Sequence, residues 1–233
     1  MDKDKRRHNY FTAGELALWF GSMSAILVSF VCFDHSAVLT LAASLIGVTS
    51  LLFCAKGNPA GQVLMLIFSV LYGIISWQVQ YYGEVVTYLG MTAPMAAAAL
   101  FSWLRHPSSE GRAEVEVGHL TWNDIFLMLV FTGGVTVAFW LILAAFHTAQ
   151  LPVSTLSVTT SFLAAWLTFR RSPFYALAYA ANDGVLIVLW ALEARTNTAA
   201  AAVLVCFAAF FINDMYGFFN WRRMARRQRS ALR

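Results

Sequence analysis

A polar pair and a tryptophan interrupt an apolar stretch that runs from about residue 174 to residue 192. The pair is Asn182-Asp183, and four-residue spacing places Asn182 and Trp190 on one stripe of a helix. An apolar run of this length predicts a transmembrane helix, in which a central Asp costs roughly 2.5–3.5 kcal/mol on an insertion scale. Something must compensate that cost. Asp183 is therefore a candidate functional residue, or a brace that hydrogen-bonds a neighbouring helix.

The composition indicates a polytopic membrane protein. Of its 233 residues, 59% are hydrophobic and 12% are charged, against roughly 25% charged in an average soluble domain. The net charge of +4 comes from chain ends and loops rather than from a groove, so nucleic-acid binding is not supported. Cysteines and histidines lack metal-ligand spacing, and no cluster of titratable groups suggests an enzyme. We expect no cofactor and no metal.

Eight apolar runs are long enough to cross a bilayer of roughly 30 Å. An even number of spans puts both termini on one side of the membrane. Of the 16 Lys and Arg residues, all except Arg195 then lie on the terminal side, which predicts cytoplasmic termini by the positive-inside rule. The predicted spans are residues 16–33, 37–55, 60–80, 85–104, 125–146, 151–169, 174–192 and 198–221.

A polar residue followed by proline occurs at corresponding loops in the two halves of the chain. Asn58-Pro59 and Ser172-Pro173 lie 114 residues apart, each between two apolar runs, and Trp103 and Trp221 end the third helix of each copy. Copies four spans apart share one orientation, which gives parallel repeats. The two tryptophans are expected to be interfacial belt residues.

The predicted fold is an all-α membrane protein with eight transmembrane helices, in which an extra N-terminal helix precedes two parallel three-helix repeats joined by a linker helix (3+1+3). The expected units are residues 1–36 (cytoplasmic tail and extra N-terminal helix), 37–104 (first repeat), 105–150 (cytoplasmic loop and linker helix), 151–221 (second repeat) and 222–233 (basic cytoplasmic tail).

Motifs in both halves resemble the PnuC family of vitamin uptake proteins. Residues 181–190 (ANDGVLIVLW) and 213–224 (NDMYGFFNWRRM) look like the two signature stretches of that family, and residues 72–77 (YGIISW) and 82–84 (YGE) are similar to its first-half pattern. The resemblance covers roughly residues 37–224. It implies an architecture like that of full-length SWEET transporters, a binding site between the repeats and a homotrimer in the bacterial inner membrane. The positions that it assigns to substrate binding are Asn182, Asp183, Trp190, Asn213, Tyr72, Trp77 and Tyr216.

The resemblance implies facilitated diffusion of nicotinamide riboside, and the residue types suit that ligand. An aromatic face can hold the cationic pyridinium ring, and Asn side chains can donate to and accept from the carboxamide and the ribose. No Lys or Arg lies within a predicted span, so a phosphate would lack a charged partner. Thiamine or riboflavin as substrate stays open, as does proton-coupled uptake through Asp183 or Asp214.

Overall fold

The computed structural model describes residues 10–33, 38–78, 82–108, 113–148 and 150–231. Among these residues, seven helices are long and apolar enough to span a membrane, and residues 60–75 add a shorter apolar helix. The prediction of an all-α membrane fold is confirmed. The helices are α1 (Ala13–Phe33), α2 (Val38–Ala55), α3 (Ala60–Gln78), α4 (Tyr82–Thr87), the π-helical segment η1 (Tyr88–Thr92), α5 (Ala93–Arg105), α6 (Trp122–Ala145), α7 (Leu151–Phe169), α8 (Tyr175–Glu193) and α9 (Ala200–Ala231).

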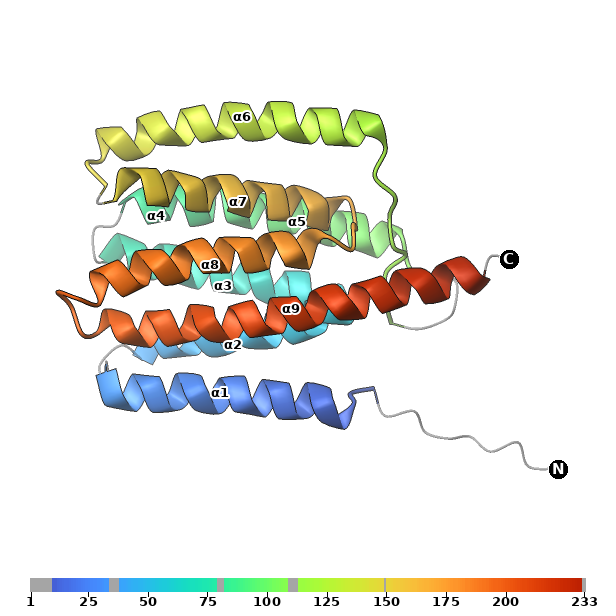
Figure 1. Cartoon of the computed structure of the whole chain (residues 1–233), viewed down its shortest axis with the longest axis horizontal. Coiled ribbons are helices and arrows are strands. Elements are labelled where there is room, and N and C mark those ends of the chain that lie inside the picture. The colour runs from blue at the N-terminus through green and yellow to red at the C-terminus, as the bar shows by residue number, and fades with distance from the viewer. Residues whose placement is uncertain (1–9, 34–37, 79–81, 109–112, 149, 232–233) are drawn as a thin grey trace.

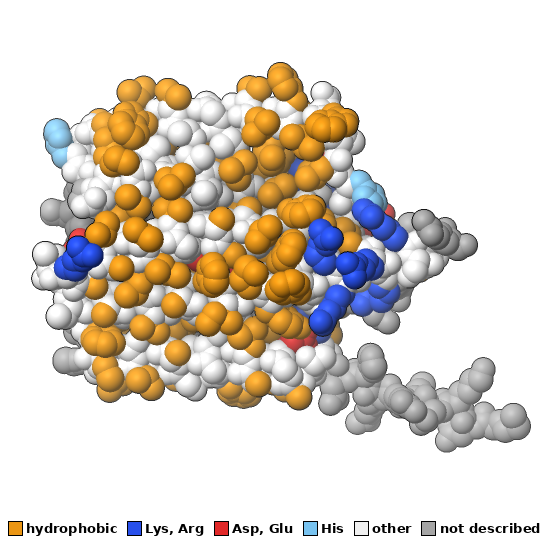
Figure 2. Space-filling view, in the orientation of Figure 1, with side chains coloured by type: hydrophobic (Ala, Val, Ile, Leu, Met, Phe, Trp, Pro, Cys, Tyr) orange, Lys and Arg blue, Asp and Glu red, His pale blue; other side chains and the backbone are white. Residues whose placement is uncertain are grey.

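The helices form one bundle, with α1 and α6 at opposite edges (Figure 1). Both described ends of the chain lie at the same end of the bundle, here called the terminal face. Lys and Arg side chains gather there, and apolar side chains cover the length of the bundle (Figure 2). The surface of α6 includes Phe126, Val137 and Leu141, each more than 60% exposed. Such a surface is stable in lipid and would be costly in water.

The loops after α2 and α7 have the same local structure. Two residues after the ends of α2 and α7, the backbone is left-handed, at Gly57 (φ 66°) and Arg171 (φ 54°). The next residue starts the turn that leads into the following helix: Asn58 Oδ1 accepts from the Ala60 N–H (2.9 Å), and Ser172 Oγ accepts from the Phe174 N–H (3.3 Å). Corresponding residues lie 114 positions apart, as the sequence pattern predicted.

Trp103 and Trp221 are fully buried, so the prediction that they are interfacial belt residues is wrong. Trp103 Nε1 of α5 donates to the carbonyl of Thr168 in α7 (2.9 Å), and Trp221 Nε1 of α9 donates to the carbonyl of Cys54 in α2 (2.8 Å). A tryptophan Nε1–H must find an acceptor when it is buried. Each ring thus joins the last helix of one half to the first helix of the other. We call the α2–α9 contact seam A and the α5–α7 contact seam B.

An extended segment, residues 113–118, crosses the terminal face and contacts both halves of the chain. The Val115 N–H donates to the Gly57 carbonyl (2.9 Å), and the Gly118 N–H donates to the Arg171 carbonyl (3.0 Å). Val115 and Val117 pack into the core around the two tryptophans. The end of α9 holds the same segment, because Gln228 Oε1 accepts from the Val117 N–H (2.8 Å). Residues 113–118, here called the strap, therefore hold the two halves together at the terminal face.

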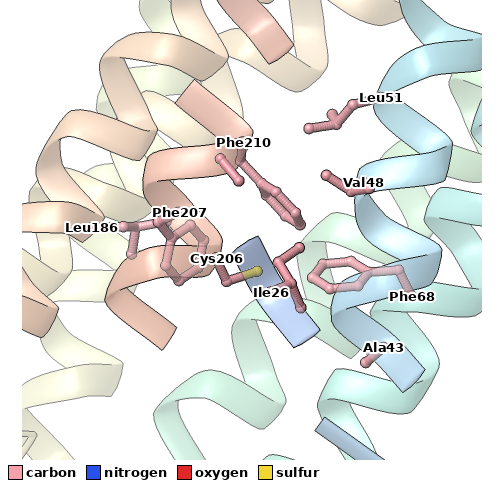
Figure 3. Packing of buried hydrophobic residues seen from close by; sticks show 10 residues of the cluster. Ile26, Ala43, Val48, Leu51, Phe68, Leu186, Cys206, Phe207 and Phe210 are labelled. Carbon is pink, nitrogen blue, oxygen red and sulfur yellow. The ribbon is translucent and has the colours of Figure 1, made fainter. Parts of the chain in front are cut away.

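Nearer the middle of the bundle, an aromatic cluster joins α2, α3, α8 and α9. Figure 3 shows Phe210 of α9 extending toward Val48 of α2 and Phe68 of α3, while Phe207 lies beside Leu186 of α8. These side chains are buried, and five of the buried cluster residues also line the cavity described next, namely Leu51, Phe68, Leu186, Phe207 and Phe210.

Candidate functional site

A cavity of about 390 Å³ lies between the two halves of the bundle. It begins among exposed residues at the end opposite the terminal face, including His147 and Gln150, and reaches inward to Tyr179 and Asp214. Beyond this depth the buried core around Trp103 and Trp221 closes the terminal face. The cavity is therefore accessible from the end of the bundle opposite the terminal face.

The two halves of the chain supply different walls. On one side, η1 widens the helix ahead of Pro94, and the Thr92 hydroxyl donates to the Thr87 carbonyl (3.2 Å). A π-helical segment commonly marks a functional site. This one places Thr87, Tyr88 and Thr92 in the lining. On the other side, the lining residues of α7 are Ser154, Ser157, Val158 and Ser161.

Asn182 of α8 lies in the lining and is held in a fixed orientation. Its Oδ1 accepts a hydrogen bond from Thr160 Oγ1 of α7 (2.8 Å), and the side chain is 95% buried. A threonine hydroxyl on the amide oxygen leaves the NH2 group to serve as a donor. Asn182 is therefore suited to bind a carbonyl or hydroxyl oxygen of a ligand.

Asp183 of α8 and Asp214 of α9 meet at the inner end of the cavity. Both are 4% exposed, and their carboxyl groups lie within hydrogen-bonding reach of each other. One oxygen of the pair, Asp183 Oδ2, is buried and has no hydrogen-bond partner among the described residues. Buried polar atoms normally have partners, and an unpaired buried carboxylate oxygen is costly. This atom is therefore a candidate ligand contact.

The charged groups of the lining are mainly acidic. Glu193 lies at the mouth and the two aspartates lie at the inner end, while no Lys or Arg is among the lining residues that the structure describes. Aromatic rings from several helices complete the lining, namely Phe68, Tyr88, Phe146, Tyr179, Trp190, Phe207 and Phe210. Such a site favours a flat cationic ligand over an anionic one.

Three of the seven sequence-predicted site residues, Asn182, Asp183 and Trp190, line this cavity. A fourth, Tyr72, lies behind its wall, and its ring packs against the ring of the lining residue Tyr88 with 4.4 Å between centroids and a tilt of 40°. Trp77 is 63% exposed on the surface of the bundle.

The remaining two predicted residues turn toward α1. Asn213 Nδ2 donates to Ser22 Oγ (2.8 Å), and the Tyr216 hydroxyl donates to Glu15 Oε1 (2.8 Å). Asn213 is buried and Tyr216 is partly buried, and α1 covers both side chains. The neighbouring Asp214 is the α9 carboxylate that reaches the cavity.

Several lining residues were missed by sequence reasoning. The serines of α7 follow a helical spacing of three and four residues, which was a usable signal for a polar stripe. Asp214 entered the sequence-based prediction with Asp183 only for proton coupling and not as a residue of the binding site. The aromatic wall formed by Phe68, Phe207 and Phe210 carried no signal, because phenylalanines in an apolar span are ordinarily core or lipid-facing.

Comparison with known proteins places this cavity in a family context. Residues 37–223 match the family described as "Nicotinamide mononucleotide transporter". The nicotinamide riboside transporter PnuC of Haemophilus influenzae is 23% identical over 190 residues, which cover 81% of each chain. The protein of the same name from Neisseria mucosa is 22% identical over 222 residues, covering 94% of this chain and 83% of the relative.

A solved structure shares the fold. The crystal structure of the vitamin B3 transporter PnuC superposes with a TM-score of 0.80 at 22% sequence identity, and the match covers 94% of both chains. The family match spans well over half of the present chain. The protein therefore belongs to the PnuC, or nicotinamide mononucleotide transporter, family of membrane transporters, which are not enzymes.

Proposed function

We propose that the protein takes up nicotinamide riboside. Two relatives carry that substrate in their names, and the lining of the cavity suits its chemistry. The observation that carries the proposal is a cavity with aromatic walls and carboxylates at both ends, into which no described Lys or Arg projects. A pyridinium ring can stack on Trp190, and the amide of Asn182 can bind a ribose hydroxyl or the carboxamide.

The same lining separates the riboside from the mononucleotide. A phosphate group is bound in proteins by Arg, Lys or clustered backbone N–H groups. Here a phosphate would meet Glu193 at the mouth and the aspartate pair further in. The nucleoside therefore fits better than the nucleotide, although the family description names the latter.

Transport by alternating access accounts for the arrangement of the two halves. In the 3+1+3 arrangement that we propose, α2–α5 and α7–α9 are parallel repeats. Two observations support parallel repeats. The turns at Asn58 and Ser172 lie 114 residues apart, and each tryptophan bonds a carbonyl of the opposite half. Opening the seams at the terminal face while the cavity mouth closes would carry the substrate across. Because this needs no second substrate, we propose facilitated diffusion.

We propose an orientation in the membrane from the charge distribution. In the predicted topology all Lys and Arg residues except Arg195 belong to the terminal side, which favours a terminal face in the cytoplasm and a cavity mouth outside. We place the protein in a bacterial inner membrane, as a homotrimer. Cross-linking or mass measurement of the protein in detergent tests the trimer.

A binding panel tests the choice of substrate. Purified protein is titrated with nicotinamide riboside, nicotinamide mononucleotide, thiamine and riboflavin by calorimetry. The proposal predicts the tightest binding for the riboside and at least tenfold weaker binding for the mononucleotide, a difference of about 1.4 kcal/mol. Tighter binding of thiamine or riboflavin would reassign the substrate within the same fold.

A further inference from the structure

The aspartate pair is the strongest unexplained feature of the cavity. Asp183 and Asp214 come from different helices, both are 96% buried, and they face each other without a Lys or Arg among the described lining residues. Two ionised carboxylates that face each other in a buried site repel each other. A pair that served only to brace α8 against α9 would place a donor against each oxygen, yet Asp183 Oδ2 has no partner among the described residues.

We propose that Asp183 and Asp214 together form a recognition site for the positive charge of the substrate. A delocalised ring cation brings charge without N–H donors, so it can relieve the repulsion of two carboxylates while the neighbouring aromatic walls hold its faces. The ligand class is a planar organic cation on a neutral sugar. Asp214 thereby becomes a determinant of specificity, and Asp183 contacts the ring in preference to the ribose. This inference rests on the proposed function.

Charge and shape can be separated with one pair of ligands. Nicotinamide riboside carries a cationic ring, whereas its reduced form, dihydronicotinamide riboside, has nearly the same shape and no ring charge. The structure predicts that the protein binds the oxidised form at least tenfold more tightly than the reduced form. In Asp214→Asn, an isosteric change that removes the charge, this ratio should fall about tenfold, the factor that corresponds to 1.4 kcal/mol.

Two further variants sharpen the test. Asp183→Asn should lower the ratio as Asp214→Asn does, since each removes one carboxylate of the pair. Glu116→Gln, which removes an exposed carboxylate of the strap outside the cavity lining, should change the ratio less than twofold. Thermal unfolding of each purified variant checks that it is folded.

The outcomes separate this inference from the proposed function. If the parent binds both forms equally, or if the aspartate variants keep the parent's ratio, the recognition site is wrong while riboside transport stands. If the parent binds neither form, the proposed function itself fails.

A second, independent inference concerns α1, which lies outside the family match that begins at residue 37. Both α1 and α6 begin with a reciprocal capping box. Thr12 N–H donates to Glu15 Oε2 (2.7 Å) and Glu15 N–H donates to Thr12 Oγ1 (3.2 Å). In α6, Thr121 N–H donates to Asp124 Oδ2 (2.9 Å) and Asp124 N–H donates to Thr121 Oγ1 (3.2 Å).

The capping carboxylates also make matched ion pairs. Glu15 Oε1 lies 3.0 Å from Lys56 Nζ, and Asp124 Oδ2 lies 2.6 Å from an Arg170 guanidinium nitrogen. Lys56 and Arg170 follow the ends of α2 and α7 and are 114 residues apart, the spacing of the repeat.

The packing of the two helices matches as well. α1 packs on α2 and α9, the two helices of seam A. α6 packs on α7, and its residues Val135, Phe139 and Leu143 share an apolar cluster with Met91 of η1 and with Met95 of α5, which forms seam B with α7. Figure 1 shows the two helices at opposite edges of the bundle.

We infer that α1 is the structural counterpart of α6, so that the repeating unit has four helices. Each unit then begins with a helix that covers one seam. Glu15 and Asp124 act as positioning residues that keep the seams closed at the terminal face. This inference does not depend on the identity of the substrate.

Thiol labelling can test each seam separately. Cys54 lies buried in seam A, and Thr168, 114 residues later, occupies the corresponding place in seam B. In a Cys32→Ser background, Glu15→Gln should raise the maleimide labelling rate of Cys54 about tenfold, as expected if closure weakens by 1.4 kcal/mol. In Thr168→Cys, Asp124→Asn should raise labelling of the new thiol by a similar factor.

Each carboxylate variant serves as the control for the other seam. Asp124→Asn should leave the Cys54 rate within twofold of the parent, and Glu15→Gln should do the same for Thr168→Cys. A response at only one seam, at neither, or at both seams from either single variant would overturn the equivalence of α1 and α6.

Discussion

At the scale of single residues, Asn182 is the side chain whose role in binding is most directly testable. Thr160 fixes its amide at 2.8 Å, and Asn182→Ala removes the donor that we assign to the ligand. Loss of one such bond costs about 1–3 kcal/mol, so nicotinamide riboside should bind at least fivefold more weakly by calorimetry. Thr160→Val keeps the amide and removes only its restraint, and should cost less. Unchanged binding in Asn182→Ala would place the ligand elsewhere.

The two buried tryptophans are predicted to contribute similarly to stability. Trp103→Phe and Trp221→Phe each retain a ring but remove the indole N–H that bonds a carbonyl of the opposite half. We expect a loss of about 1–3 kcal/mol in the free energy of unfolding in each variant, because a buried hydrogen bond and part of the packing of the larger ring are lost, and this is measured as a lowered Tm in detergent.

Trp122 provides the matched control for the tryptophan variants. Its side chain is 87% exposed at the start of α6. Trp122→Phe should therefore leave the Tm within about 1 °C of the parent, since exposed substitutions away from special features have small effects. A drop in Trp122→Phe as large as that in Trp221→Phe would contradict a specific role for the cross-seam bonds.

At the scale of elements, the strap depends on a glycine. A Cβ built on Gly118 would lie 2.2 Å from the Arg170 carbonyl oxygen, which is backbone and cannot rotate away. Gly118→Ala should therefore displace the strap and destabilise the protein by more than 1 kcal/mol, seen as a lower Tm and as faster proteolysis between residues 106 and 121.

Gly133→Ala is the counterpart of Gly118→Ala within a helix. A Cβ at Gly133 meets nothing within 4 Å, and alanine is the better helix former by about 1 kcal/mol. This variant should be neutral or slightly stabilising. If Gly118→Ala behaved in the same way, the strap would not be held against Arg170 as described.

Much of the element-level description could be predicted from the sequence. The starts of α3 and α8 could be predicted because their causes are local. A polar residue followed by proline, as in Asn58-Pro59 and Ser172-Pro173, favours the start of a helix without any tertiary information. The end of α9 was not predicted, since its arginines could equally belong to a solvated tail. In the structure the helix continues to Ala231, where Gln228 bonds the strap.

The site could be predicted only where one helix determines it. Asn182 and Asp183 lie on α8 and were found from an apolar stretch alone. Whether Asn213 or Asp214 faces the cavity depends on where α1 packs, and residues adjacent on a helix point about 100° apart. The burial of Trp103 and Trp221 depends likewise on the opposite half of the chain. Such choices require the assembled bundle.

At the scale of the whole molecule, the structure combines an accessible cavity on one side with a closed face on the other. Closure uses the two tryptophan bonds, the strap on Gly57 and Arg171, and the ion pairs of Glu15 and Asp124. Release of a substrate at the terminal face requires that the contacts of both seams open. Each seam has its own tryptophan bond and its own ion pair, so each can loosen separately, and a rocking of the two halves opens both.

Uptake into proteoliposomes tests this account most directly. Protein reconstituted without any ion gradient should let labelled nicotinamide riboside enter until its inner and outer concentrations are equal. The initial rate of entry should saturate as the riboside concentration rises, and nicotinamide mononucleotide should enter much more slowly. An inward proton gradient should change neither the initial rate nor the plateau. Accumulation above the outer concentration, driven by that gradient, would contradict facilitated diffusion, and the absence of riboside entry would contradict the proposed function.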